Sequence, residues 1–279
     1  MAEYKYKGID VSKHQGKINW AQVASSGIEF VMIRAGYGMY ATQEDAQFKA
    51  NIEGAYAAGI KNIGVYWYSY ATTVEQGIKE AQVCLNVISK YKDKINLPVF
   101  FDQEYEQSIK NITRSARTEI VKNFCKAVYS AGYRTGIYAS KDWLENWVTV
   151  SSFDSYIETW VAQYNSSCTY KGSHIVWQYS STGKVSGISG NVDMDKATAS
   201  LIVGSSNSTP KWEKTSAGWK YGTSKNKWEK INDIWYYFDA NGIAVTGWHQ
   251  IKGIWYYFLT QSDADRTGGK ECSCYSIAK

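Results

Sequence analysis

The chain has 279 residues, 44% of them hydrophobic, with 12 Trp, 23 Tyr and a formal net charge of +5. This length suits one large domain with a small one, or two domains of equal size. The small, evenly spread charge excludes the basic block of a nucleic-acid-binding protein, and no apolar run is long enough to insert into a membrane. The excess of aromatic rings favours a ligand that stacks on ring faces, such as a sugar or a quaternary ammonium ion.

The five Cys and three His form no metal-binding pattern. Cys84 and Cys125 lie among apolar residues at helical spacing and are expected to be core thiols, whereas Cys168 lies in a loop-like stretch. Cys272 and Cys274 are too close for an ordinary mutual disulfide bond and lack the spacing of metal ligands. We therefore expect neither a metal ion nor a cofactor.

The first two hundred residues alternate between strand-like and helix-like patterns. Five strand–helix units are expected, with strands at residues 8–11, 30–35, 63–70, 99–104 and 135–139 and helices at 20–25, 44–58, 74–90, 115–131 and 140–147. Ser140 is expected to N-cap the last of these helices. Three further strands follow at 159–164, 175–179 and 192–195. Eight strands with an incomplete ring of helices predict an α/β fold with a closed or nearly closed barrel.

Two carboxylates end the fourth predicted strand. The apolar run 99–101 leads into Asp102 and Glu104, which share one face because strand side chains alternate. Like charges this close raise each other's pKa and cost free energy. A sugar-cleaving site needs such a pair, with one carboxyl protonated and the other ionised. A solvated strand end would give the same pattern, so this segment alone leaves both interpretations open.

Other strand ends carry matching residues. Asp10 ends the first predicted strand and Asp193 the eighth, and these two strands are neighbours in a closed barrel. Four acids are therefore expected at one mouth of the barrel. The predicted strands also carry possible sugar-binding side chains, namely Tyr66, Tyr68, Tyr138, Trp160 and Gln178. Core packing would explain each ring taken singly, but the set indicates an acidic pit walled by rings.

Motifs on every predicted strand together resemble the family 25 glycoside hydrolases, the muramidases of phages, bacteria and some fungi. They lie at residues 8–16 (GIDVSKHQG), 64–68 (GVYWY), 101–104 (FDQE), 136–138 (GIY), 160–164 (WVAQY), 177–179 (WQY) and 187–193 (GISGNVD). The resemblance covers roughly residues 5–203. It implies a flattened (β/α)5β3 barrel that cleaves the β-1,4 bond between N-acetylmuramic acid and N-acetylglucosamine.

The resemblance also assigns roles to single residues. The catalytic acids of the family fall on Asp10, Asp102, Glu104 and Asp193. Its sugar-contacting aromatic residues fall on Tyr66, Tyr138 and Trp160. We expect Glu104 to be the general acid, with net retention at the anomeric carbon and with Asp102 or Asp193 assisting. Gln103 departs from the family, which usually has an aliphatic residue there, but strand alternation points Gln103 away from the mouth.

Near residues 201–210 the composition changes to small polar residues ending in a proline, which predicts a linker. The expected division is a catalytic domain at 1–203, a linker at 204–210 and a second module at 211–279. In the module the spacing Trp-x6-Trp-x-Tyr occurs three times, at Trp212, Trp219 and Tyr221, at Trp228, Trp235 and Tyr237, and at Trp248, Trp255 and Tyr257. Turn signals at 232–233 and 252–253 predict hairpins, which should stack as a small all-β solenoid because a lone hairpin is unstable.

This repeat resembles the choline-binding (cell-wall-binding) repeat of pneumococcal and clostridial lytic enzymes. The resemblance implies that rings of successive hairpins form a cage for a quaternary ammonium ion. Rings that only pack the hairpins together would give the same spacing, and packing and binding can coexist. The first copy is degenerate after Trp219, and residues 260–279 match no known pattern.

Together these features predict a two-domain peptidoglycan hydrolase, a lysozyme (N-acetylmuramidase) of the phage endolysin or autolysin type. Its expected partners are peptidoglycan and choline, or a similar cation, on teichoic acid. The opening residues MAEYKYKGIDVS lack the apolar core of a signal peptide, which fits an endolysin kept in the cytoplasm until release to the cell wall. Removal of a signal peptide would leave the same mature sequence. Two alternatives stay open: a wall-binding protein with an inactive barrel, and a barrel hydrolase of another N-acetylated glycan such as chitin.

Overall fold

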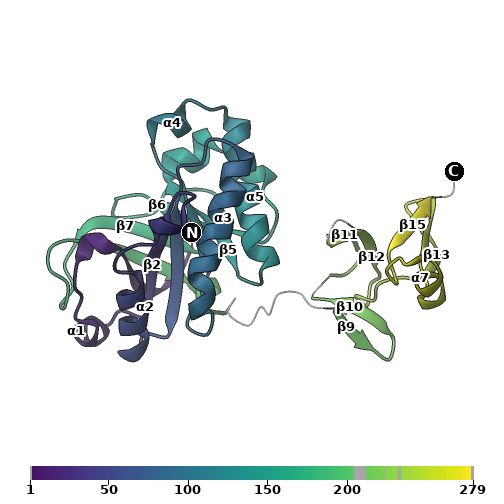
Figure 1. Cartoon of the computed structure of the whole chain (residues 1–279), viewed down its shortest axis with the longest axis horizontal. Helices are drawn as coiled ribbons and strands as arrows, with labels where there is room; N and C mark the ends of the chain where they lie inside the picture. Colours follow the sequence, from purple (N-terminus) through teal and green to yellow (C-terminus); the bar gives the residue numbers. More distant parts are fainter. Residues whose placement is uncertain (1, 204–211, 223, 232–233, 278–279) are drawn as a thin grey trace. The chain divides into compact units, whose positions relative to one another are not determined.

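The computed structural model divides the chain into two compact units, residues 1–207 and 208–279 (Figure 1). It describes residues 2–203, 212–222, 224–231 and 234–277. The predicted linker at 204–210 and the predicted turn at 232–233 lie outside the described residues. No helix in the described part of the chain is both long and apolar enough to cross a bilayer.

The first unit is a closed barrel in which each strand pairs with the next and the last pairs with the first. Its strands are β1 (Tyr4–Val11), β2 (Phe30–Tyr37), β3 (Asn62–Tyr68), β4 (Val99–Asp102), β5 (Thr135–Ser140), β6 (Ile157–Ala162), β7 (Val176–Gly183) and β8 (Val192–Thr198). The strands from β1 to β7 run parallel, whereas β8 is antiparallel to both of its neighbours. The predicted α/β barrel of eight strands is confirmed.

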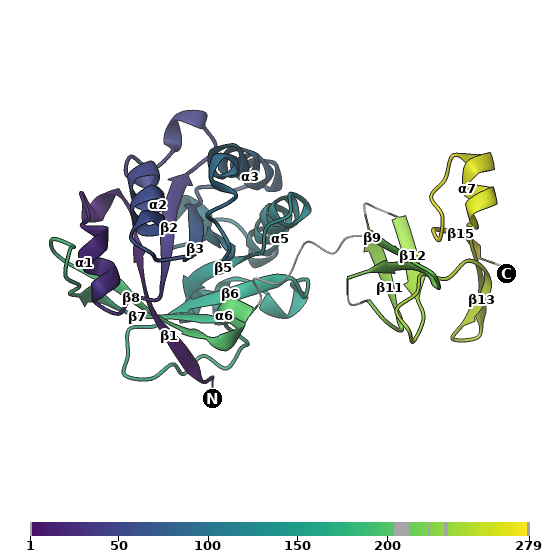
Figure 2. The ribbon, with the colours of Figure 1, turned by 90° about the horizontal axis from the view of Figure 1, so that it is seen from below.

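Most of the helices cover the barrel on the side of the first five strands, and the side of β6 to β8 carries loops and the short helix after β8 (Figure 2). The helices are α1 (Trp20–Ser25), α2 (Phe48–Ala57), α3 (Val74–Ile88), α4 (Gln107–Lys110), α5 (Arg114–Ser130) and α6 (Ala199–Val203). Thr73 and Thr113 cap α3 and α5, because each hydroxyl accepts from a backbone N–H of the first turn. A side chain at Gly77 of α3 would meet Ile120 of α5, so the glycine allows these helices to approach closely.

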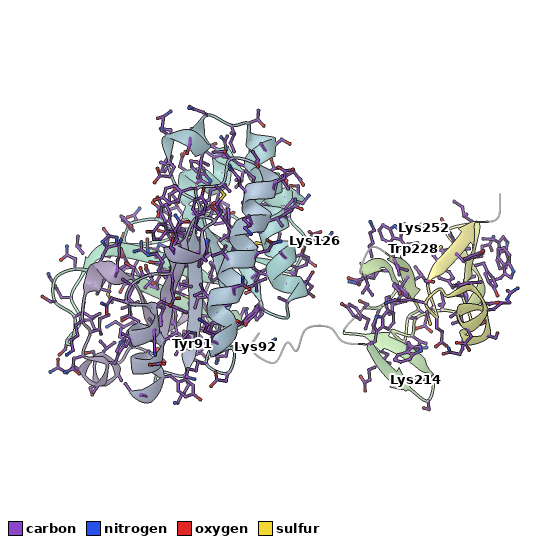
Figure 3. All side chains as sticks on the ribbon, in the orientation of Figure 1. Tyr91, Lys92, Lys126, Lys214, Trp228 and Lys252 are labelled. Carbon is purple, nitrogen blue, oxygen red and sulfur yellow. The ribbon has the colours of Figure 1, made fainter. Side chains whose placement is uncertain are left out.

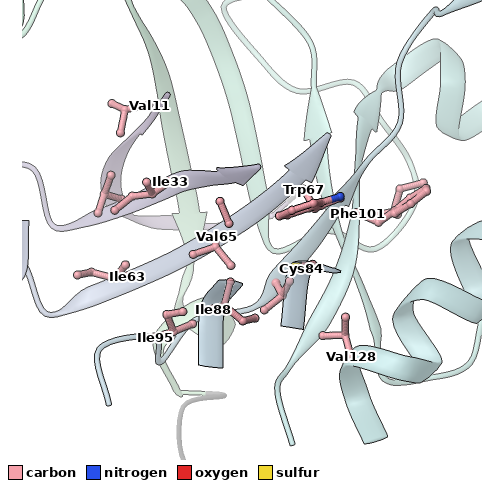
Figure 4. Close-up of a cluster of buried hydrophobic side chains, with 14 of the residues drawn as sticks. Val11, Ile33, Ile63, Val65, Trp67, Cys84, Ile88, Ile95, Phe101 and Val128 are labelled. Atoms are coloured by element: carbon pink, nitrogen blue, oxygen red, sulfur yellow. The ribbon is translucent and has the colours of Figure 1, made fainter. Parts of the chain in front are cut away.

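Strand alternation sorts the apolar side chains into two layers. One layer lies between the strands and the helices and includes Val65, Trp67 and Phe101 (Figure 4). The other fills the barrel interior and includes Phe30, Met32, Phe100, Trp160, Val176 and Ala197. Further along the same inner faces the residues become polar, as at Asp102 two places beyond Phe100. The apolar filling therefore ends below a polar mouth.

Two of the predicted strand ends are wrong in detail. The strand β4 ends at Asp102, so Glu104 lies beyond the ladder and not on a common strand face with Asp102. Asp193 lies at the beginning of β8 and not at its end. Because β8 runs antiparallel to its neighbours, its beginning lies at the same mouth as the ends of the other strands.

The helix predicted at 140–147 is also different. It is a π-helical turn at Trp143–Trp147, whose first backbone N–H donates to the Ser140 hydroxyl at 3.1 Å. Trp143 in this turn donates its ring N–H to the Gln103 side chain at 3.0 Å, in a buried contact. The Gln103 side chain thus packs in the helical layer outside the barrel.

The second unit consists of three antiparallel hairpins. They are formed by β9 (Trp212–Thr215) with β10 (Gly218–Tyr221), β11 (Lys227–Ile231) with β12 (Ile234–Phe238), and β13 (Gly247–Ile251) with β14 (Ile254–Phe258). The tail, which matched no pattern, forms α7 (Gln261–Thr267) and β15 (Cys274–Ile277), and β15 pairs with β14. The predicted small all-β hairpin domain is confirmed.

Successive hairpins pack through the first tryptophan of the first copy and of the second. Trp212 lies 4.8 Å from the Tyr236 ring of the second hairpin, measured between ring centroids. Trp228, labelled in Figure 3, lies at the same distance from the Tyr256 ring of the third. Phe238 and Phe258 complete these two contacts. The copies therefore form a stacked array.

Candidate active site

Four acids meet at the polar mouth of the barrel. Asp10 on β1 is the direct cross-strand partner of Asp193 on β8. Asp102 ends β4, and Glu104 follows two residues later. The charge of Glu104 acts on the pKa of both Asp10 and Asp102, and the charge of Asp193 acts on that of Glu104. The structure therefore places each of the four predicted acids within electrostatic reach of at least two of the others.

The surroundings of these acids favour protonated carboxyls. Burial, followed by the charge of Asp193, raises the pKa of Asp10 to about 8. Burial and then the charge of Glu104 raise the pKa of Asp102 well above its usual range, and the nearby Arg34 opposes this rise. The pKa of Glu104 is raised by burial, by Glu106 and by Asp193. Glu104 can thus hold a proton at a higher pH than an ordinary glutamic acid.

Gln178 on β7 orients Asp10. The hydroxyls of Tyr138 and Tyr164 donate to the Gln178 carbonyl oxygen at 2.9 and 3.0 Å. Because the carbonyl is held by the two tyrosines, the amide nitrogen faces Asp10 and donates to its Oδ2 at 2.8 Å. This chain of hydrogen bonds fixes one Asp10 oxygen.

The predicted sugar-binding rings occupy different levels of the site. Tyr66 and Tyr138 lie at the mouth and are mostly buried. Tyr68 is partly exposed, and its hydroxyl donates to Glu106 at 2.7 Å. Trp160 is only 1% exposed and packs edge-on against Tyr138 at 4.5 Å, so its ring supports the floor and offers no free face to a sugar. This placement departs from the sugar-contacting role expected for Trp160.

Several residues of the mouth were missed by sequence reasoning. Asp195, two places after Asp193 on β8, lies in the barrel and accepts from the Trp160 ring N–H at 2.9 Å. Arg34 follows Met32 on the inner face of β2 and is held by Asp45 at 2.7 Å. Strand alternation applied to β8 and β2 would have placed both inside the barrel. Tyr164 lies beyond the end of β6, although the strand predicted at 159–164 would have placed it on the same face as Trp160.

The three aromatic sets of the second unit differ in their surroundings. In the second hairpin Trp228 lies edge-on to Trp235 at 6.3 Å and beside Tyr237 at 5.5 Å, and Trp235 is 49% exposed. In the third hairpin Trp248 contacts Tyr257 at 5.2 Å, and both Trp248 and Trp255 are exposed. These two hairpins therefore present open ring faces.

In the first hairpin, other side chains of the protein already contact the Trp219 ring. The ammonium group of Lys214 lies 5.2 Å from the centre of the Trp219 ring, and the Trp219 ring N–H donates to Glu271 of the tail at 2.6 Å. Tyr221 and Trp212 pack on the cluster that contains the buried Cys272. A cation of the protein thus already lies over one ring of this copy.

In the part of the chain that the structure describes, no three His, Cys, Asp or Glu side chains are grouped so as to hold a metal ion. Two acids of the barrel instead accept hydrogen bonds from protein donors, Asp10 from the Gln178 amide and Asp195 from the Trp160 indole. The arrangement is suited to moving protons between carboxyls and a bound substrate.

The raised pKa of Asp10 predicts a pH-dependent stability. Between the ordinary value of 3.8 and about 8, the buried carboxyls of Asp10 and its neighbour Asp195 together bind more protons in the folded chain than in the unfolded one, so their contribution to stability is lost as pH rises through this window. The melting temperature should fall as pH rises from about 5 to 8, and Asp10→Asn should flatten this slope. Thermal unfolding followed by circular dichroism across this range measures it. The exposed control Asp93→Asn should leave the slope unchanged.

An eight-stranded α/β barrel with clustered carboxyls at its mouth is typical of glycosidases. The sequence profile of the glycosyl hydrolases family 25 matches residues 9–188, and that of the choline-binding repeat matches residues 225–266. The chain belongs to the glycosyl hydrolases family 25. The predicted family and the predicted type of repeat are confirmed.

Named relatives agree with this assignment. The chain is 34% identical over 203 residues to the autolytic lysozyme of Clostridium acetobutylicum, covering 71% of this chain and 57% of that protein. It is 32% identical over 204 residues to lysozyme M1 of Streptomyces globisporus, covering 68% and 67% respectively. Among solved structures, the modular autolysin LytC of Streptococcus pneumoniae matches with a TM-score of 0.60 and 27% identity, over 68% of this chain and 46% of LytC. LytC has also been solved with a synthetic peptidoglycan ligand.

Proposed function

We propose that the protein is a lysozyme that hydrolyses the β-1,4 bond between N-acetylmuramic acid and N-acetylglucosamine in peptidoglycan. The observation that carries this proposal is the cluster of Asp10, Asp102, Glu104 and Asp193 at one barrel mouth, with the pKa of Glu104 raised. Membership of family 25 and the lysozyme names of the two relatives support it.

Glu104 is the general acid in the proposed mechanism. Its carboxyl protonates the glycosidic oxygen as the bond to the anomeric carbon breaks, and N-acetylglucosamine leaves with a new hydroxyl. Asp193 is more exposed than the buried Asp102, and burial raises the pKa of Asp102 well above its usual range. Asp193 is therefore the carboxylate better placed to stay ionised and to stabilise the positive charge that develops on the sugar.

We expect hydrolysis with net retention of configuration. The substrate carries an acetamido group whose carbonyl oxygen can attack the anomeric carbon from the face opposite the leaving group. The ionised Glu104 then takes a proton from a water molecule, which attacks from the original face and restores the configuration. NMR of the first product formed, recorded before mutarotation, should show the β-anomer. An initial α-anomer would contradict retention.

The second unit is proposed to hold the enzyme on the cell wall through choline or a similar cation on teichoic acid. The exposed rings of the second and third hairpins support this proposal, because the face of an indole attracts a quaternary ammonium ion. The place of action is then the bacterial cell wall. For a phage endolysin, the protein would stay in the cytoplasm until release.

Clearing of purified cell walls tests the proposed function. Turbidity should fall when the protein is added, and mass spectrometry should find fragments with N-acetylmuramic acid at the reducing end. Walls that are bound but not cleared would indicate an inactive barrel with a wall anchor. Release of soluble sugars from chitin, without clearing of peptidoglycan, would indicate a hydrolase of another N-acetylated glycan.

A further inference from the structure

A second buried carboxyl lies directly behind Asp10. Asp195 on β8 is the cross-strand partner of Gly8, two residues from Asp10 on the same inner face of the barrel. Its side chain is fully buried. The Trp160 ring N–H donates to Asp195 Oδ1 at 2.9 Å, whereas Asp195 Oδ2 receives no donor from the described residues.

The geometry of this pair requires a proton. The carboxyls of Asp10 and Asp195 are near enough to affect each other's pKa through a side-chain hydrogen bond, although Asp195 Oδ2 has no donor of its own. Two ionised carboxylates carry acceptors alone, so the contact is favourable only when one of them is protonated. Asp10 Oδ2 already accepts from Gln178 at 2.8 Å, which favours the ionised form of Asp10. The proton therefore belongs on Asp195 Oδ2, the buried oxygen without a donor.

The surroundings of the pair are mostly acidic. The titratable and charged groups that face it are Asp193 on β8, Asp102 at the end of β4, Glu104 two residues beyond that end, Tyr66 on β3, Tyr138 on β5, Tyr164 after β6 and Tyr179 on β7. The positive charge of Arg34 on β2 opposes the rise in the pKa of Asp102 and of Tyr66. This excess of negative charge adds to the reason for the pair to keep one proton.

We propose that Asp195 is a positioning residue that stays protonated, donates its Oδ2–H to Asp10 and holds the Asp10 carboxylate at the mouth. The inference rests on the proposed hydrolase function. Asp195 and Gln178 then hold the Asp10 carboxylate through two hydrogen-bond donors, one from β8 and one from β7. One proton shared by two carboxyls also keeps the pair at a single negative charge, which limits repulsion from Asp193 and Glu104.

Two substitutions of Asp195 distinguish a positioning role from a catalytic one. In Asp195→Asn the amide carbonyl still accepts from Trp160 and the amide N–H still donates to Asp10, so kcat on soluble peptidoglycan fragments should stay within about threefold. In Asp195→Ala the donor is gone, and kcat should fall about tenfold or more with little change in KM. The alkaline limb of the pH profile should be the same in Asp195→Asn as in the wild type, because a side chain that stays protonated loses no proton in this range. Equal, deep losses in both variants would mean that Asp195 acts as an ionised carboxylate and would overturn the proposal, as would wild-type kinetics in Asp195→Ala.

A second readout does not depend on activity. Carbon NMR of protein labelled at the aspartate carboxyl carbons identifies Asp195 as the resonance missing from Asp195→Asn. That resonance should show the shift of a neutral carboxylic acid near neutral pH, whereas the exposed Asp93 should show that of a carboxylate. An ionised Asp195 would overturn the proposal even if Asp195→Ala does not fold. If the wild-type protein fails to clear cell walls, the proposed function falls, and the NMR result still decides the state of Asp195.

Discussion

Replacing Glu104 by Gln should lower kcat on peptidoglycan by about 10²–10⁴-fold, because the amide cannot protonate the leaving oxygen. The pKa of Glu104 is raised by burial and by the charges of Glu106 and Asp193, which keeps a larger share of this carboxyl protonated near neutral pH. The acid form is lost as pH rises through this raised pKa. The wild-type rate should therefore decline on the alkaline side, and the residual rate of Glu104→Gln should lack that decline.

Glu106→Gln is the matched control, since Glu106 is the neighbouring carboxylate that raises the pKa of Glu104. This change removes one negative charge but leaves the proposed acid in place, so the rate should change far less. The alkaline decline should move to lower pH, because the pKa of Glu104 falls when a like charge is removed. Initial rates across pH, with binding to cell walls measured in parallel, test both variants. Near-normal activity in Glu104→Gln with intact folding would rule out Glu104 as the general acid.

The sequence predicted the acid cluster because strand ends in a barrel share one mouth. Period two and the adjacency of the first and last strands were enough to place Asp10 beside Asp193. The pattern does not give strand direction, so the antiparallel course of β8 was missed although Asp193 still reached the mouth. The role of Trp160 was also beyond the pattern, because its burial depends on Tyr138 and Phe100 from other strands.

The repeat spacing predicted the hairpins of the second unit, since their cross-strand pairs are local. The tail was not predictable in this way. Glu271 reaches the Trp219 ring of the first hairpin, and Cys272 is buried with Tyr236 and Phe238 of the second. These contacts join residues far apart in the sequence, so the spacing of the repeat cannot predict them. They also make the first copy unlike the other two, although the three share the same spacing.

Trp235→Ala should abolish a saturable response of the full chain to choline. Trp235 is the informative position because Trp228 packs the second hairpin against the third, so its loss would disturb the array as well as the ligand site. The Trp235 ring is half exposed and lies edge-on to Trp228, beside the open face of the hairpin. Removing it takes away a ring face without removing an inter-hairpin contact of Trp228.

The expected affinity follows from the number of ring faces. A desolvated cation–π contact is worth up to about 2 kcal/mol, so two or three faces give a gross few kcal/mol before the ligand is immobilised. Binding at each site should then be roughly millimolar. Teichoic acid presents many cholines on one polymer, so two sites on neighbouring hairpins gain avidity without new contacts. The first hairpin should contribute little, because Lys214 already lies over its Trp219 ring.

The measurement is a choline titration of the full chain followed by tryptophan fluorescence, with wall binding assayed alongside. Tyr275→Ala is the control, because Tyr275 is a strongly exposed aromatic residue outside the three repeat sets. It should leave the titration unchanged, whereas Trp235→Ala should remove most of the response and weaken wall binding. The titration should extend to about 100 mM choline, well above a millimolar dissociation constant. If the wild-type chain gives no response but still binds walls, it recognises a different wall ligand. In that case the exposed rings of the second and third hairpins would remain the place to look for it, because a planar aromatic face also accepts the apolar face of a sugar.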